Sequence, residues 1–163
     1  MAITLNQSNG LKLVLSIILC EGVGIISGLL AAPEMKQWLG TLQVPSWNPP
    51  SYLFGPVWTL LYFLMGVSFW LIWKSTAPDK QKKYAMIVFF VQLVLNFLWS
   101  FIFFNLHSPF FALINILLML IAIALTMYYF SFISRIASWL LLPYLLWVCF
   151  ATVLNFSIWS LNS

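Results

Sequence analysis

The chain has 163 residues, of which 63% are hydrophobic and 6% are charged, and its formal net charge is +4 at pH 7. An ordinary soluble domain carries about 25% charged residues, so this composition excludes one and indicates a membrane protein. The sequence has no Ser-His-Asp set, paired carboxylates or phosphate-binding glycine loop, which argues against conventional acid–base hydrolysis.

Five apolar runs are long enough to cross a membrane. A helix needs about 20 apolar residues to span a hydrocarbon core of about 30 Å. Membrane strands would instead alternate over about ten residues each, and these runs do not. The sequence therefore predicts an all-α membrane protein, a five-helix bundle forming one domain over residues 1–163. The spans are expected at about 11–32, 51–73, 83–106, 109–131 and 136–160.

The basic residues are divided unequally between the two ends of such a bundle. Lys36 alone falls on one side. The positive-inside rule then predicts a cytoplasmic N-terminus if the membrane is a bacterial cell membrane. The net charge favours contact with a lipid surface over nucleic acid, for which there is no motif. The side with the N-terminus holds Lys12, Lys74, Lys80, Lys82, Lys83 and Arg135.

The first span carries one acid and several small residues on a single face. Gly24, Gly28 and Ala32 would let another helix approach closely. Glu21 lies near the middle of the bilayer, where a carboxylate costs several kcal/mol unless it is neutral, paired or wet. We expect it to face the bundle interior with a protonated or hydrogen-bonded carboxyl. It is either a functional group or a partner of a nearby Tyr, Trp or backbone group.

The sequence predicts that residues 33–50 form a lid over the mouth of the bundle. Pro33 is expected to end the first helix, and later prolines exclude helix until about residue 51. A loop of this length is usually functional or disordered, and Trp38 and Trp47 argue against disorder. Either tryptophan alone would be an interfacial anchor, whereas the pair in a stiff loop favours a lid.

The second and third spans each have a face that combines aromatic and polar side chains. Trp58 and Tyr62 recur at helical spacing in the second span, and Gln92, Asn96 and Trp99 do so in the third. Side-chain amides in hydrocarbon need hydrogen-bond partners. They either join helices or bind a ligand, and the residues alone favour the first role.

The fifth span presents a similar face beside a proline. Pro143 is expected to kink the helix. Tyr144, Trp147, Ala151 and Asn155 fall within about a quarter of its circumference. The small Ala151 between larger neighbours would leave room for a flat ligand. The mixed faces of four helices, together with the lid, thus predict a pocket for a large, flat, mostly apolar molecule held by a few hydrogen bonds.

No metal site is predicted. Cys20 and Cys149 lie inside predicted spans and are expected to be buried as small hydrophobic residues. His107, in the short loop after the third span, is a weak candidate for haem ligation.

Three motifs in this order resemble the TspO/translocator protein family, also called the peripheral benzodiazepine receptor family. They are Pro45-Ser-Trp-Asn-Pro-Pro50 with Phe54-Gly-Pro-Val-Trp-Thr59, then Gln92-Leu-Val-Leu-Asn96 with Trp99, and last Pro143-Tyr-Leu-Leu-Trp147 with Phe150-Ala-Thr-Val-Leu-Asn155. The resemblance covers nearly the whole chain and favours a bacterial member.

The resemblance implies a five-helix membrane protein, commonly a homodimer, that binds porphyrins such as protoporphyrin IX and haem, sterols and benzodiazepine-type compounds as ligands and needs no cofactor. The helical faces add Tyr62 and Trp99 to the site. By motif match, the ligand pocket would use Trp38, Trp47, Trp58, Gln92, Asn96, Tyr144, Trp147, Ala151 and Asn155.

The function that the resemblance implies is porphyrin binding for tetrapyrrole handling or stress regulation. One alternative is an enzyme that degrades porphyrin in light through Trp58 and Trp147. Others are a carrier of tetrapyrroles, sterols or lipids, and a structural protein without a ligand.

The sequence departs from the family in two places. The animal sterol-recognition pattern needs a Tyr and then a basic residue, but here Phe156 and Ser157 follow Asn155, which argues against tight sterol binding. The third span lacks the small-residue pair through which some members dimerise, so Gly24 and Gly28 become the expected alternative surface.

Overall fold

The computed structural model describes residues 2–163. The side chains of residues 2–7 and of Lys36, which entered the predicted charge asymmetry, lie outside the described part.

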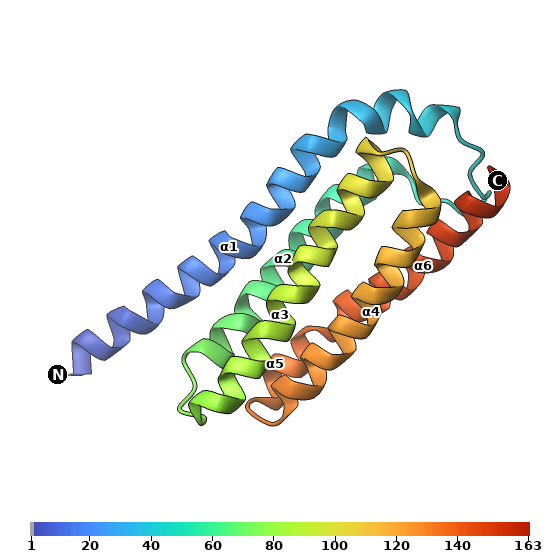
Figure 1. The fold of residues 1–163 in the computed structure, drawn as a ribbon. Coiled ribbons are helices and arrows are strands. Elements are labelled where there is room, and N and C mark those ends of the chain that lie inside the picture. The colour runs from blue at the N-terminus through green and yellow to red at the C-terminus, as the bar shows by residue number, and fades with distance from the viewer. Residues whose placement is uncertain (1) are drawn as a thin grey trace.

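The described chain is a bundle of long helices (Figure 1). Five segments are long and apolar enough to span a membrane, which confirms the predicted five-helix membrane bundle. The helices are α1 (Ala2–Gln37), α2 (Ser51–Trp73), α3 (Asp79–Ser100), α4 (Pro109–Ser131), α5 (Arg135–Leu140) and α6 (Leu142–Leu161), with a 3-10 turn η1 (Leu39–Thr41) and a π-helical turn η2 (Phe101–Asn105).

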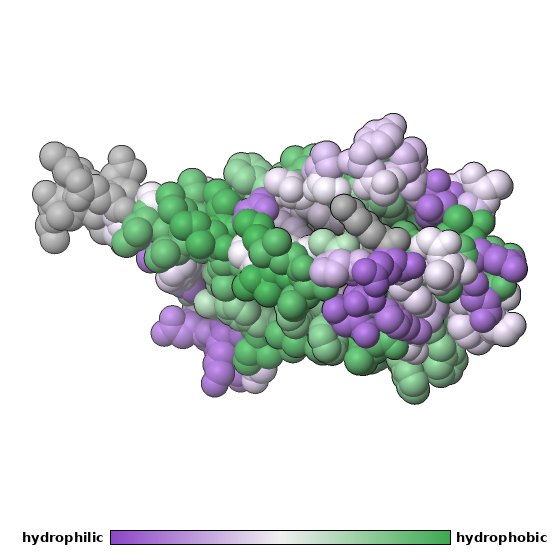
Figure 2. All heavy atoms as spheres, turned by 90° about the horizontal axis from the view of Figure 1, so that it is seen from above, coloured by the Kyte–Doolittle hydropathy of each residue, from purple (hydrophilic) through white to green (hydrophobic). Residues whose placement is uncertain are grey.

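The outer surface of the bundle suits contact with lipid. Leu29 of α1 and Ile136 of α5 are 70% and 68% exposed. In the face shown in Figure 2, apolar residues cover broad areas and hydrophilic residues gather in separate patches. A soluble monomer rarely exposes so much contiguous apolar surface, so the chain is a multi-pass membrane protein in a lipid bilayer.

Helix α1 extends past the proline that was expected to end it. It continues through Pro33 to Gln37, so the segment before α2 is shorter than the predicted lid of residues 33–50. Pro33 has no N–H to donate to the Leu29 carbonyl, and Asn105 of η2 donates its side-chain amide to the neighbouring Leu30 carbonyl of the same turn, at 3.0 Å. Such substitute partners are what allow proline inside a membrane helix.

The third span does not end as a simple α-helix, and the fifth span is broken into two helices where the sequence predicted a kink. After α3, the chain widens into η2, and His107 then has a φ of 52°, a left-handed conformation that is uncommon for residues other than glycine. The fifth span breaks at Leu141 into α5 and α6. Pro143 then lies in the first turn of α6, where its missing N–H costs little.

Only one of the two cysteines is buried. Cys20 is fully buried in the core, as predicted, whereas Cys149 is exposed. The prediction for Cys149 is wrong because this residue lies on the outward face of α6, while its neighbour Val148 is fully buried. A position inside a span does not by itself distinguish the bundle interior from lipid.

Two glycines let α1 and α2 approach closely. A Cβ on Gly66 would lie 2.7 Å from the Ile17 Cα, and a Cβ on Gly24 would meet the Tyr62 ring. Gly24 therefore serves packing within the chain, and its expected place in a dimer surface stays a prediction. Gly28 has no heavy atom within 4 Å of an added Cβ.

We predict that Gly66→Ala lowers the free energy of unfolding by about 1–3 kcal/mol, because the methyl group meets backbone atoms of Ile17 that cannot move aside. Thermal unfolding in detergent, followed by circular dichroism, measures the change. Gly55→Ala in the same helix is the control, since nothing lies within 4 Å of its added Cβ. Equal melting temperatures for the two variants would contradict this account of the α1–α2 contact.

Candidate functional site

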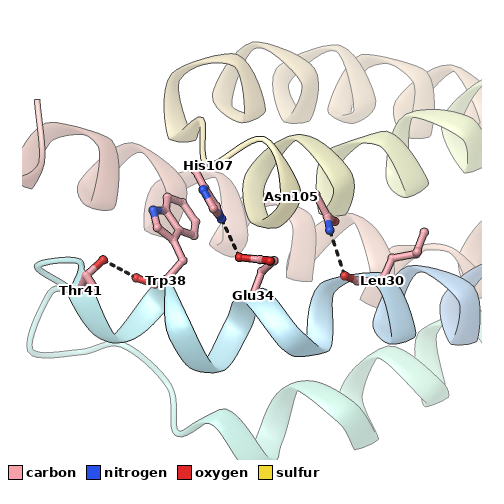
Figure 3. A network of polar contacts seen from close by, with 6 residues as sticks. All are labelled: Leu30, Glu34, Trp38, Thr41, Asn105 and His107. Atoms are coloured by element: carbon pink, nitrogen blue, oxygen red, sulfur yellow. Dashed lines mark hydrogen bonds and ion pairs between the residues drawn. The ribbon is translucent and has the colours of Figure 1, made fainter.

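One end of the bundle is covered by the lid (residues 38–50), which consists of η1 and the segments that join it to α1 and α2. Trp38, at the start of the lid, stacks on His107 with ring centroids 4.8 Å apart and meets Phe103 edge-on at 5.3 Å. The Glu34 carboxylate lies 2.9 Å from His107 Nε2 (Figure 3). The left-handed turn at His107 thus places its ring against the end of α1.

The C-terminal end of the chain fastens the lid at a second point. The Gln43 N–H donates to Asn162 Oδ1 at 2.9 Å, and Asn162 Nδ2 donates to the Gln43 carbonyl at 2.8 Å. Trp47 packs edge-on against Phe150 of α6 at 5.9 Å. The lid is therefore tied to both the π-helical turn and the end of α6.

Beneath the lid lies a cavity of about 80 Å³ between α2, α3, η2 and α6. Its walls are mostly apolar and aromatic, and five of the predicted ligand residues line it. These five are Trp58, Trp99, Trp147, Ala151 and Asn155.

A second cavity of about 260 Å³ lies between α1, α2 and α3. Glu21 and Tyr62 line this cavity and not the first. A shared wall separates the two cavities, and it consists of Met35, Phe54, Trp58, Trp99 and Phe104.

The other predicted polar residues form a buried hydrogen-bond chain behind these walls. Tyr62 donates its hydroxyl to Asn96 Oδ1. Asn96 Nδ2 donates to the Tyr144 oxygen at 2.9 Å, and the Tyr144 hydroxyl donates to Gln92 Oε1 at 2.9 Å. Gln92 and Asn96 line neither of the two cavities, so their contacts are those of side chains that join α2, α3 and α6.

Two tryptophans that line the 80 Å³ cavity differ in the hydrogen bonding of their indole N–H groups. Trp99 Nε1 donates to Asn155 Oδ1 at 2.9 Å, and Asn155 Nδ2 donates to the Pro109 carbonyl at 2.8 Å. Trp147 Nε1 is buried and has no acceptor among the described residues. A buried donor without a partner costs free energy, so this N–H is available to an acceptor on a ligand.

The structure places the remaining predicted residues outside the cavity under the lid. Trp38 and Trp47 belong to the cover and do not line that cavity. Glu21 is half-buried at the edge of the bundle and makes no hydrogen bond to a described side chain. Glu21 faces the bundle, as expected, because it lines the second cavity between α1, α2 and α3.

Sequence reasoning missed several apolar residues of the cavity wall. Phe54 lies one turn before Trp58, and Leu154 and Ile158 continue the face of Ala151, so helical spacing could have found them. Phe104 lies in η2, and its position in the cavity wall depends on this π-helical turn, which the sequence does not indicate.

The chain is similar to known proteins over most of its length. A sequence model of the TspO/MBR family matches residues 16–160. Tryptophan-rich protein TspO of Archaeoglobus fulgidus is 43% identical over 155 residues, which cover 95% of this chain and 99% of the relative. Tryptophan-rich protein TspO of Chlorobaculum tepidum is 43% identical over 153 residues, 93% of this chain and 96% of the relative. Translocator protein of Homo sapiens is 39% identical over 130 residues, 79% of this chain and 77% of the relative.

We predict that Tyr144→Phe lowers the free energy of unfolding by about 1–3 kcal/mol, because it leaves buried amide groups of Asn96 and Gln92 without partners. The loss is measured as a drop in melting temperature in detergent. Tyr128→Phe is the matched control, since the Tyr128 ring is 58% exposed. If the Tyr144 variant and the control had the same melting temperature, the buried hydrogen-bond chain would not be a stabilising element.

Proposed function

The chain belongs to the TspO/MBR family, and we propose that it binds a flat, mostly apolar tetrapyrrole, such as protoporphyrin IX or haem, in the cavity beneath the lid. The role would be tetrapyrrole handling or stress regulation. The observation that carries the proposal is the cavity wall itself, which Trp58, Trp99 and Trp147 all line, together with the buried Trp147 N–H that has no acceptor among the described residues.

The chemistry of this wall matches such a ligand. Indole faces pack against a conjugated ring system through offset or edge contacts. The Trp147 N–H would donate to an acceptor on the ligand, such as a carboxylate or carbonyl oxygen. Ala151 leaves open the space that a larger side chain would fill. Ligand pockets with a mainly apolar lining and a few polar groups are typical of small-molecule sites.

The size of the cavity requires movement on binding. Pockets for drug-sized ligands measure about 300–1,000 Å³, whereas this cavity measures about 80 Å³. We therefore infer that a tetrapyrrole is admitted when the lid lifts, which breaks the contacts of Gln43 with Asn162 and of Trp38 with His107.

Light-dependent porphyrin degradation is the second candidate function, because Trp58 and Trp147 line the same cavity. An indole beside a photoexcited porphyrin would donate an electron or trap an oxygen product, with dioxygen as the oxidant. A carrier of tetrapyrroles or lipids is a third candidate. The homodimer and the cytoplasmic N-terminus remain predictions.

We predict that Ala151→Leu weakens protoporphyrin IX binding at least tenfold, because the added atoms fill the space beneath the lid. Titration of the detergent-purified protein in the dark, followed by tryptophan fluorescence and porphyrin absorption, measures the affinity. Val153→Leu, at a lipid-exposed position of the same helix, is the control. Trp147→Phe should also weaken binding, by a smaller factor, through loss of its N–H.

The same titration under illumination separates the candidate functions. New absorption bands that appear only in light, and disappear when Trp58 and Trp147 are both Phe, would support degradation. Saturable binding without new bands supports a binding protein. Protoporphyrin affinity that is equal in the wild type and the Ala151→Leu variant would place the ligand elsewhere and overturn the proposed site.

We predict that Asn162→Ala raises both the association and dissociation rates of protoporphyrin IX by about fivefold, with little change in affinity. The variant loses the two hydrogen bonds to Gln43, each worth about 1 kcal/mol or less at an exposed position, so the lid opens more often. Stopped-flow fluorescence measures the rates, and Ser160→Ala is the control. Unchanged rates would show that the lid is not the barrier to binding.

A further inference from the structure

The end of the bundle away from the lid holds six of the seven basic residues, and three of them have partners within the chain. The Lys12 ammonium lies 5.8 Å from the centroid of the Trp73 ring, and that of Lys74 lies 3.5 Å from the centroid of Trp70. Lys82 Nζ donates to the carbonyls of Trp73 and Ser75 at 3.2 and 3.1 Å.

The other three basic residues at this end are uncompensated. Lys80, Lys83 and Arg135 make no side-chain hydrogen bond, ion pair or cation–π contact with another described residue. Asp79, the first residue of α3, is the one acid at this end, and it forms no ion pair within 4 Å among the described residues. Positive charge therefore remains without a partner where α3 begins.

A cavity lies beside this charge, between the beginning of α3 and the end of α4. It measures about 330 Å³ and is open to the surface, since Lys80, Gln81, Tyr84 and Phe132 are all exposed. Lys80, Gln81 and Tyr84 line it from α3, and Tyr129 and Phe132 line it from the α4 side. The lining thus offers an ammonium, a side-chain amide and two phenolic hydroxyls, none of which has a hydrogen-bond partner among the described side chains.

The level of this cavity in the membrane follows from its neighbours. Trp70 and Trp73 lie near the end of α2, under the cations of Lys74 and Lys12, and α3 begins a few residues later. Tryptophan, tyrosine and lysine gather at the boundary between hydrocarbon and headgroups. Phe132 is 63% exposed on the apolar side of the cavity.

We propose that this cavity binds the phosphate of an anionic glycerophospholipid headgroup. Lys80 supplies the charge, the hydroxyls of Tyr84 and Tyr129 and the Gln81 amide donate to phosphate oxygens, and an acyl chain lies against Phe132. Basic pockets between membrane helices bind headgroups in this way. A zwitterionic headgroup fits less well, because its own cation would compete with Lys80 for the phosphate.

The test is a titration of the full chain, purified in detergent, with phosphatidylglycerol and, separately, with phosphatidylcholine of the same acyl chains. Native mass spectrometry counts the bound lipid. We expect saturable binding of one phosphatidylglycerol, at least tenfold tighter than phosphatidylcholine. Lys80→Gln should weaken it about tenfold and Tyr84→Phe less. Lys83→Gln is the control, because it removes the same charge from the same helix outside the cavity lining.

Three outcomes would overturn the proposal. Equal affinity for the two lipids would show no headgroup preference. Equal weakening by Lys80→Gln and Lys83→Gln would indicate diffuse charge attraction in place of a site. Displacement of phosphatidylglycerol by millimolar inorganic phosphate would identify a site for free anions and not for lipid. Each variant is checked by circular dichroism and by its protoporphyrin affinity, which does not depend on this end of the bundle.

Discussion

The hydrogen-bond chain through Tyr62, Asn96, Tyr144 and Gln92 is the constraint on which the rest of the structure depends. In hydrocarbon, each of these polar groups would be costly without a partner. Because they satisfy one another, α2, α3 and α6 are held in one relative position. The tryptophans of the cavity lie within about one turn of these residues, so their positions follow from the same contacts.

The two ends of the cavity therefore differ in how they are held. Its floor rests on buried hydrogen bonds that water cannot replace, whereas its cover is fastened by exposed groups. Asn162 and Gln43 pair at the surface, and His107 is 43% exposed where it meets Glu34. Exposed pairs of this kind are worth about 1 kcal/mol or less. A ligand can therefore displace the cover without disturbing the packing that shapes the floor.

The sequence was sufficient for those features that depend on hydropathy and helical spacing. The five spans are confirmed, and Trp58, Trp147 and Ala151 meet at one cavity because residues three and four apart share a helix face. The extension of α1 through Pro33 could not be predicted, because the contact between Asn105 and Leu30 joins residues that are 75 apart in sequence. The outward position of Cys149 depends on how a whole helix is rotated, and a uniformly apolar helix carries little information about rotation.

The wall between the two cavities explains how so small a space could serve a large ligand. Of its five residues, only Trp99 makes a side-chain hydrogen bond with another described residue, to Asn155, and the others are held by packing. Because these five residues line both cavities, side-chain movement within this wall is what would connect the two spaces. The connected space would extend from the lid to Glu21, which lines the second cavity.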